Sequence, residues 1–217
     1  MSCERAERGT RSFRLAWSAA MLALAILVAS CGTDGHDAPA IPSGVTDIGG
    51  PPMTSAPPPP PGWNPKDVVP QDQQQAQDTL KGYLVRTLRE LPDGTTLDAT
   101  RYGSAGHNSW CEDEPADPKN APTRYHTSGD LKVASGEDPA TFIRRIGDIW
   151  RGWGWYVMER DGFRKPNQFG YGPDGYRMQI VIAARDGYPP TLAGSSPCFP
   201  GTLARDDISF PAVLTAH

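Results

Sequence analysis

The stretch YRMQIVIAARDGYPPTLAGSSPC, residues 176–198, decides the fold of this chain. Apolar residues alternate with other residues over 176–184, as in a strand that buries one face. The residues on the apolar side are Tyr176, Met178, Ile180 and Ile182. Arg185-Asp186-Gly187 then makes a turn, and residues 191–198 return. The stretch therefore predicts an antiparallel β-hairpin.

Two segments upstream of this hairpin have the periodicity of amphipathic helices. Residues 72–91 repeat apolar side chains at three- and four-residue steps and end at Pro92-Asp93-Gly94. The second helix is expected to begin at Asp138-Pro139, because Asp is a favoured N-cap and Pro is favoured at the first helical position. Its apolar face consists of Phe142, Ile143, Ile146, Ile149, Trp150 and Trp153.

The remaining regular segments are predicted as strands over residues 95–102, 124–133 and 155–160, and residues 161–175 as a Gly- and Pro-rich loop. The resulting order, α-β-β-α-β-β-β, has no regular βαβ repeat and indicates the α+β class. We expect two helices on one face of a mainly antiparallel sheet of about five strands. Residues 71–217 are long enough for one such domain.

The N-terminal part of the chain predicts export and a lipid anchor. Four arginines precede an apolar run of about a dozen residues that ends in Val28-Ala29-Ser30-Cys31, the pattern of a bacterial lipobox. Residues 1–30 are then a signal peptide, and Cys31 is the lipidated first residue of the mature protein. A transmembrane anchor over residues 15–31 is the alternative, but spanning helices need roughly 20 apolar residues.

Residues 31–70 are predicted to be a Pro-rich disordered tether, since they offer few apolar side chains to a core. The five prolines at 57–61 favour a polyproline II spacer, with a ligand for an SH3-like partner as the alternative. The tether would hold the domain on the extracytoplasmic face of the cell membrane.

Charge argues against a nucleic-acid partner. The whole chain has a formal net charge of −4. Residues 1–30 contain four of its 21 basic residues and two of its 25 acidic ones, which leaves 17 against 23, a net charge of −6. Proteins that bind nucleic acid cluster Lys and Arg against the phosphates, and no such cluster is evident in the sequence.

Cys111 and Cys198 are the two cysteines that remain after Cys3 in the signal peptide and Cys31 at the lipid site. In an oxidising compartment a disulfide between them is the expected state. The spacing of His107 and Cys111 suggests a metal site as the alternative, but no second ligand pair follows at zinc spacing.

No catalytic residue, metal site or cofactor is predicted, because no nucleophile, metal or phosphate-loop motif stands in its required context. His126 is interpreted as a half-buried strand residue. The acidic residues Glu112, Asp113 and Glu114 are interpreted as a solvated loop, with a calcium site as the alternative. Phe163, Phe169 and Tyr171 are the aromatics that core packing explains least, so they are candidates for a ligand-binding groove.

The lipobox, the Pro-rich tether, Asp174-Gly175-Tyr176 at the start of one strand and Ser196-Pro197-Cys198 at the end of the next together resemble the LppA-like lipoproteins of actinobacteria. This resemblance implies a membrane-anchored α+β module and transfers no catalytic residue. We expect a non-catalytic binding module whose partner is an envelope protein, glycan or lipid. The alternative is an envelope hydrolase with an acidic site.

Overall fold

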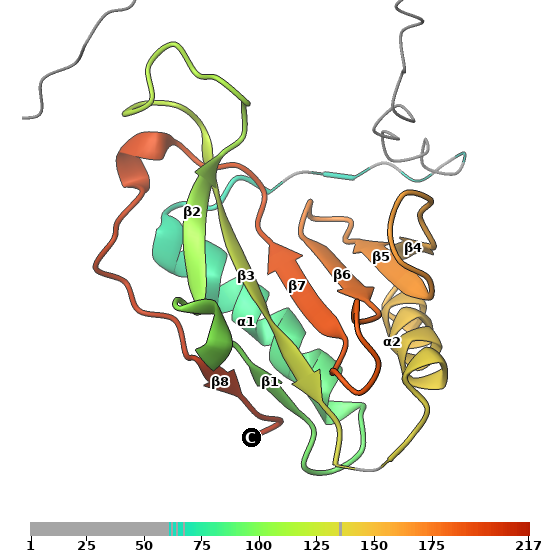
Figure 1. Cartoon of the computed structure of the whole chain (residues 1–217). Coiled ribbons are helices and arrows are strands. Elements are labelled where there is room, and N and C mark those ends of the chain that lie inside the picture. The colour runs from blue at the N-terminus through green and yellow to red at the C-terminus, as the bar shows by residue number, and fades with distance from the viewer. Residues whose placement is uncertain (1–60, 62, 64, 67, 135) are drawn as a thin grey trace, which may run out of the picture. The chain divides into compact units, whose positions relative to one another are not determined.

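Figure 1 shows the computed structural model of the chain, which describes residues 61, 63, 65–66, 68–134 and 136–217. This part of the chain contains two α-helices and a sheet of eight strands. The elements in order are α1 (Gln73–Arg89), β1 (Thr96–Asp98), β2 (Gly106–Trp110), β3 (Thr123–Lys132), α2 (Pro139–Gly152), β4 (Tyr156–Met158), β5 (Asn167–Tyr171), β6 (Arg177–Val181), β7 (Thr191–Ser195) and β8 (Val213–Leu214). The predicted α+β class with an antiparallel sheet is confirmed, with more strands than expected.

The sheet runs in the order β4-β5-β6-β7-β3-β1-β8, and every pairing is antiparallel. Its longest strand, β3, pairs with β7 on one side. On its other side the first half of β3 pairs with β2 and its end pairs with β1. The hairpin predicted from residues 176–198 is formed by β6 and β7, which lie at the centre of the sheet.

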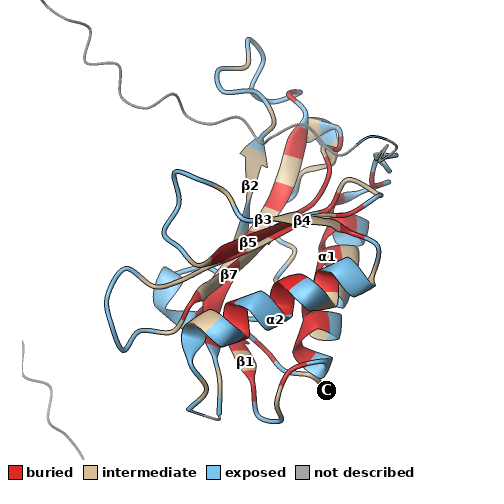
Figure 2. Ribbon diagram, turned by 90° about the vertical axis from the view of Figure 1, so that its right-hand side faces the viewer, coloured by how far each residue is buried: buried red, intermediate tan, exposed pale blue. Residues whose placement is uncertain are grey.

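Both helices cover the same face of the sheet, and their buried residues turn toward it (Figure 2). Asp72 caps α1 by accepting a hydrogen bond from the Gln75 backbone N–H at 2.7 Å. Asp138 caps α2 in the same way, with the Thr141 N–H at 2.9 Å. The two predicted helix starts are therefore confirmed, and each cap satisfies a backbone donor that the helix leaves unpaired.

Trp150 of α2 is fully buried in the core, and its indole N–H donates to the Thr87 hydroxyl of α1 at 3.1 Å. On the sheet side its ring lies against Gly170 of β5, where a Cβ atom would be 2.8 Å from Trp150 Cε3. Glycine in a strand interior often marks such a close approach. The prediction of a loop over residues 161–175 is wrong, because Gly170 makes room for the tryptophan instead of making a turn.

Two other strands were not predicted, and two predicted strands are shorter than expected: the one over 95–102 and the one over 155–160, which spans only Tyr156–Met158. β2 (Gly106–Trp110) has one glycine, three polar residues and a single tryptophan without an apolar alternation, so its sequence pattern does not indicate a strand. β8 (Val213–Leu214) has only two residues. The strand expected over 95–102 ends at Asp98, where the Asp98 side chain accepts from the Thr100 N–H at 2.8 Å and a 3-10 helix (Thr100–Tyr102) follows.

Cys111 and Cys198 form a disulfide, with their Cα atoms 6.4 Å apart. It joins the loop that follows β2 to the segment that follows β7. The predicted pairing is confirmed, and both segments are thereby fixed at the same end of β3, where the Thr123 and Phe199 backbones exchange hydrogen bonds of 2.8 Å.

The last residues of the predicted tether contact the domain. The Lys66 N–H donates to the Pro173 carbonyl at 2.7 Å and the Val68 N–H to the Asp174 carbonyl at 3.1 Å. The predicted signal peptide, Cys31 and most of the tether lie outside the described residues. Among the described helices, none is long and apolar enough to cross a membrane.

Candidate functional site

The sheet face opposite the helices carries polar and aromatic side chains in cross-strand rows. One row runs from His126 of β3 through Ser195 of β7 and Arg177 of β6 to Tyr171 of β5. The next row on the same face includes Phe169 of β5. This arrangement follows from the period of two in a strand, which turns alternate residues away from the core.

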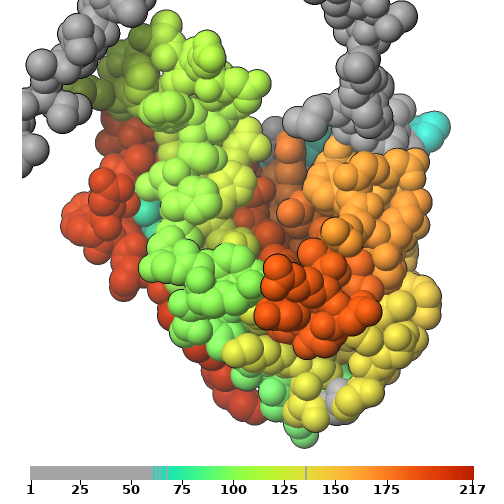
Figure 3. Space-filling model, in the orientation of Figure 1, coloured from blue at the N-terminus to red at the C-terminus, as the bar shows by residue number. Residues whose placement is uncertain are grey.

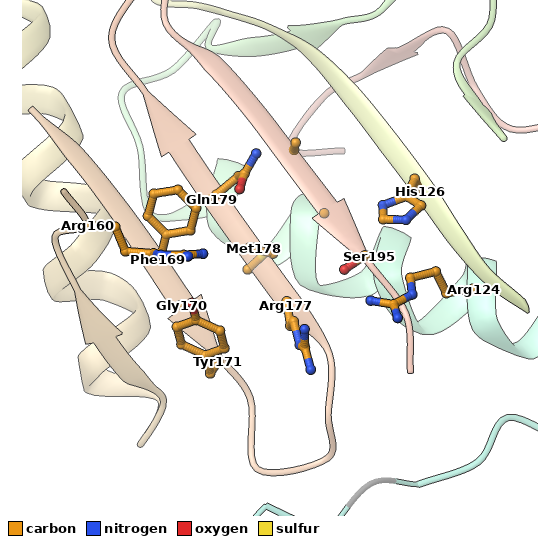
Figure 4. Close-up of a pocket in the computed structure, with 12 residues that line it drawn as sticks. Arg124, His126, Arg160, Phe169, Gly170, Tyr171, Arg177, Met178, Gln179 and Ser195 are labelled. Atoms are coloured by element: carbon orange, nitrogen blue, oxygen red, sulfur yellow. The ribbon is translucent and has the colours of Figure 1, made fainter. Parts of the chain in front are cut away.

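A cleft of about 360 Å³ opens on this face. Figure 3 shows it as a hollow over β7, between the side chains of β3 and those of β5 and β6. Its floor includes the small residues Ala193, Gly194 and Ser195, and longer side chains from the neighbouring strands form its walls (Figure 4). The volume falls within the usual range for small-molecule sites.

The lining of the cleft is basic. Arg124, Arg160 and Arg177 line it together with His126, and none of its described lining residues is an Asp or Glu. Among the described residues no carboxylate forms an ion pair with Arg124 or Arg177. A chain with a net charge of −4 has thus placed several guanidinium groups in one cleft without acidic residues among them.

Burial, and to a smaller extent neighbouring positive charge, lowers the pKa of two residues that line the cleft. Burial lowers the pKa of Arg124, and the nearby charge of Arg177 lowers it further. Burial also lowers the pKa of His126 to about 4, with smaller contributions from His107 and Arg124. The rings of the two histidines lie 5.6 Å apart. His126 is therefore neutral at neutral pH, and its predicted half-buried position in a strand is confirmed.

Two residues that line the cleft each have a buried polar atom without a hydrogen-bond partner among the described residues. These atoms are the Nε atom of Arg124 and the hydroxyl of Tyr171. Buried polar groups in folded proteins are nearly always paired with protein, water or ligand. Arg124 also has a weak contact at its other end, where Nη2 donates to the Cys111 carbonyl at 3.4 Å.

Of the three aromatic residues predicted to bind a ligand, two line the cleft and one does not. Phe169 is 4% exposed and lines the cleft, and Tyr171 lines it beside Arg177. Phe163 is 41% exposed and does not line the cleft, and its ring contacts that of Phe169 with centroids 4.7 Å apart. Phe169 and Tyr171 belong to strand β5 and not to the mobile loop in which we expected them.

Sequence reasoning did not find Arg124, Arg177 or Ser195 as site residues. The available signal was the alternation itself, which places Arg124 beside the buried Tyr125 and Arg177 beside the buried Met178. This alternation is compatible with both arginines on the uncovered face, but it cannot show that β7 lies between their strands.

The acidic residues Glu112, Asp113 and Glu114 are exposed in the loop between β2 and β3, and none of them lines the cleft. Within the described part of the chain, His, Cys, Asp and Glu side chains form no group of three that could hold a metal ion.

In comparisons with known proteins, no family model, no curated protein and no solved structure matches this chain. The resemblance to LppA-like lipoproteins therefore stays a prediction, and the cleft is the feature of the molecule that bears on its function.

Proposed function

We propose that the chain is a lipid-anchored envelope protein whose domain binds a ligand in the cleft on the uncovered sheet face without transforming it. The observation that carries this proposal is the pair of buried, unpartnered polar atoms, Arg124 Nε and Tyr171 Oη, in the lining of an opening of ligand size. A ligand that hydrogen-bonds both atoms would remove the cost of leaving them unpaired, about 1–3 kcal/mol for each.

Anchoring at Cys31 supports the extracytoplasmic part of the proposal. The lipobox and its Arg-rich leader support a position of the domain outside the membrane, and the disulfide between Cys111 and Cys198 is typical of exported proteins. A ligand of the cell envelope, such as a glycan or a lipid headgroup, would then be within reach of the cleft.

Binding is favoured over hydrolysis because the cleft lacks an evident general base. The described lining contains no carboxylate. His126 lies opposite Ser195 in the sheet register, but no hydrogen bond joins their side chains among the described residues. Because the pKa of His126 is lowered to about 4, this imidazole is a weak base at neutral pH.

The proposal can be tested by filling the cleft. The full chain would be extracted from its own envelope in mild detergent and weighed by native mass spectrometry. We expect an additional small-molecule mass on the wild type and its loss in Ala193→Trp, which fills the cleft floor. Ala134→Trp, in the exposed loop after β3, is the matched control and should keep the additional mass.

Three results would contradict the proposal. The first is that the wild type carries no added mass, and the second is that Ala193→Trp carries the same added mass as the wild type. The third concerns catalysis: if the recovered small molecule changes its covalent mass during incubation with the protein, the hydrolase alternative is favoured.

A further inference from the structure

We propose that the ligand carries a phosphate group, which Arg124 and Arg177 hold from two sides above Ser195. This inference rests on the proposed binding function, because it names the chemistry of the same cleft. It is carried by the placement of the two arginines on strands that flank β7, and by the small residues between them.

The register defines this arrangement. Arg177 of β6 lies directly opposite Ser195 of β7, and Ser195 lies opposite His126 of β3. Arg124 is two residues from His126 and therefore on the same face. Since neighbouring strands are about 4.8 Å apart, the backbones of β3 and β6 are separated by about 10 Å. In Figure 4 Arg124 extends from β3 toward the hydroxyl of Ser195.

The space between the two arginines is open because β7 contributes small side chains. Ser195 and Ala193 turn toward the cleft, whereas a larger side chain at either position would fill it. The gap of about 10 Å between the flanking backbones leaves room for an anion between two guanidinium groups. The hydroxyl of Ser195 lies at the base of the same gap and can donate a further hydrogen bond (Figure 4).

An anion is the expected occupant because two guanidinium groups line one cleft and neither has an acidic partner among the described residues, whereas Arg101 and Arg205 each have one. Arg101 forms an ion pair with Asp130, Nε to Oδ2 at 2.5 Å, and Arg205 forms one with Asp207 at 2.7 Å. Arg124 and Arg177 have no such partner among the described residues. Burial lowers the pKa of Arg124 and the charge of Arg177 lowers it further, and an anionic ligand beside the guanidinium group would oppose both effects.

The geometry favours phosphate over a carboxylate. A carboxylate has two oxygens in one plane, and one guanidinium group can satisfy both. Donors that approach from two opposite strands, with a hydroxyl below them, match an anion with three or more oxygens in a tetrahedral arrangement. The remaining lining groups, Gln179 and the Tyr171 hydroxyl, can then bind the organic part of a phosphate ester.

Inorganic phosphate is the first probe, titrated into the full chain by calorimetry at constant ionic strength in chloride buffer. We expect saturable binding that weakens about tenfold or more in Arg124→Gln and in Arg177→Gln, because each substitution removes a charge-assisted hydrogen bond. The matched control is Arg144→Gln on the exposed side of α2, where the substitution removes a hydrogen bond to the Thr141 hydroxyl. Its affinity for phosphate should equal that of the wild type.

Arg177 is exposed, so Arg177→Gln should fold even if the half-buried Arg124 does not tolerate substitution; thermal melts of each variant check this. The proposal is overturned if the wild type does not bind phosphate, or if folded Arg177→Gln binds it as tightly as the wild type. Acetate at the same ionic strength should bind at least tenfold more weakly, and equal affinity would also overturn it.

Two phosphate esters distinguish the source of the group. Tighter binding of glucose 1-phosphate than of inorganic phosphate would assign a sugar phosphate. Tighter binding of a short-chain phosphatidylglycerol that stays in solution would assign a lipid headgroup, and both results support the phosphate site. If phosphate and both esters fail to bind while the added mass of the native protein still disappears in Ala193→Trp, the phosphate inference fails and the binding function stands.

Discussion

Gly170→Ala provides a direct test of how β5 packs on α2. An added Cβ would lie 2.8 Å from Trp150 Cε3 and 3.1 Å from Trp155 Cε3. Both tryptophans are rigid and buried, at 0% and 5% exposure, so neither ring can swing away cheaply. Gly170 does not have a positive φ, so alanine can adopt its backbone conformation and the cost is steric.

The change in unfolding free energy expected for Gly170→Ala is the balance of two opposing effects. Overpacking a well-filled core costs about 1–3 kcal/mol. Replacing glycine by alanine at a compatible backbone returns about 0.4–1 kcal/mol by restricting the unfolded chain. We therefore expect Gly170→Ala to lower the free energy of unfolding by about 1–2 kcal/mol. Gly82 lies on the exposed side of α1, and a Cβ added there meets no atom of another element within 4 Å. Gly82→Ala should therefore raise the free energy of unfolding by about 0.5–1 kcal/mol.

The two variants would be compared by urea unfolding of the full chain, with the disulfide intact, at fixed pH. The midpoint should fall for Gly170→Ala and rise for Gly82→Ala, while the slope of free energy against urea stays that of the wild type. If Gly170→Ala is as stable as the wild type, β5 does not lie against Trp150 as described. A loop over residues 161–175 would then be the better account.

Three further predictions concern the anchor, the disulfide and pH. Cys31→Ala should abolish the diacylglyceryl mass and detergent-phase partition of the chain; unchanged mass and partition would exclude lipidation. Peptide mapping without reductant should recover Cys111 joined to Cys198, and reduction should lower the unfolding free energy by up to about 5 kcal/mol, since the two cysteines are 87 positions apart. Because the pKa of His126 falls from 6.5 to about 4 on folding, the unfolded chain binds more protons between these values, and stability should decrease as pH falls from 6.5 to 4. His126→Gln should flatten this pH dependence, and an equal slope in the variant would assign it to other groups.

The sequence predicted those elements whose local signals agree with their tertiary environment. Both helices combine an apolar stripe with an Asp cap, and the β6–β7 hairpin combines alternation with a glycine turn, where Gly187 has a φ of 81°. Elements without such agreement were missed. In β5, Gly170 lets the strand backbone lie close to the ring of Trp150. Nothing in the neighbouring sequence distinguishes this glycine from one in a turn.

The cleft could not be predicted because one of its walls comes from β3, which α2 and β4 separate in the sequence from β5, β6 and β7. Arg124 and Arg177 are 53 positions apart, and only the strand order places one β-strand between them. The aromatic residues were noticed because they are concentrated in a short stretch. The arginines were not, because single arginines on the polar side of a strand are usual in any half-buried sheet.

The composition of β7 gives the strongest physical reason to regard the cleft as a selected feature. On its helix-facing side Gly194 must be small, since a Cβ there would lie 2.7 Å from Leu80 Cδ1 of α1. On its uncovered side Ala193 and Ser195 are also small, but their side chains border an open volume of about 360 Å³ instead of a packed element. A central strand of a sheet ordinarily carries β-branched or aromatic residues at such positions, which would cover this volume. Packing therefore accounts for the glycine and leaves the two small residues unexplained, whereas a ligand seated on β7 between Arg124 and Arg177 requires both of them.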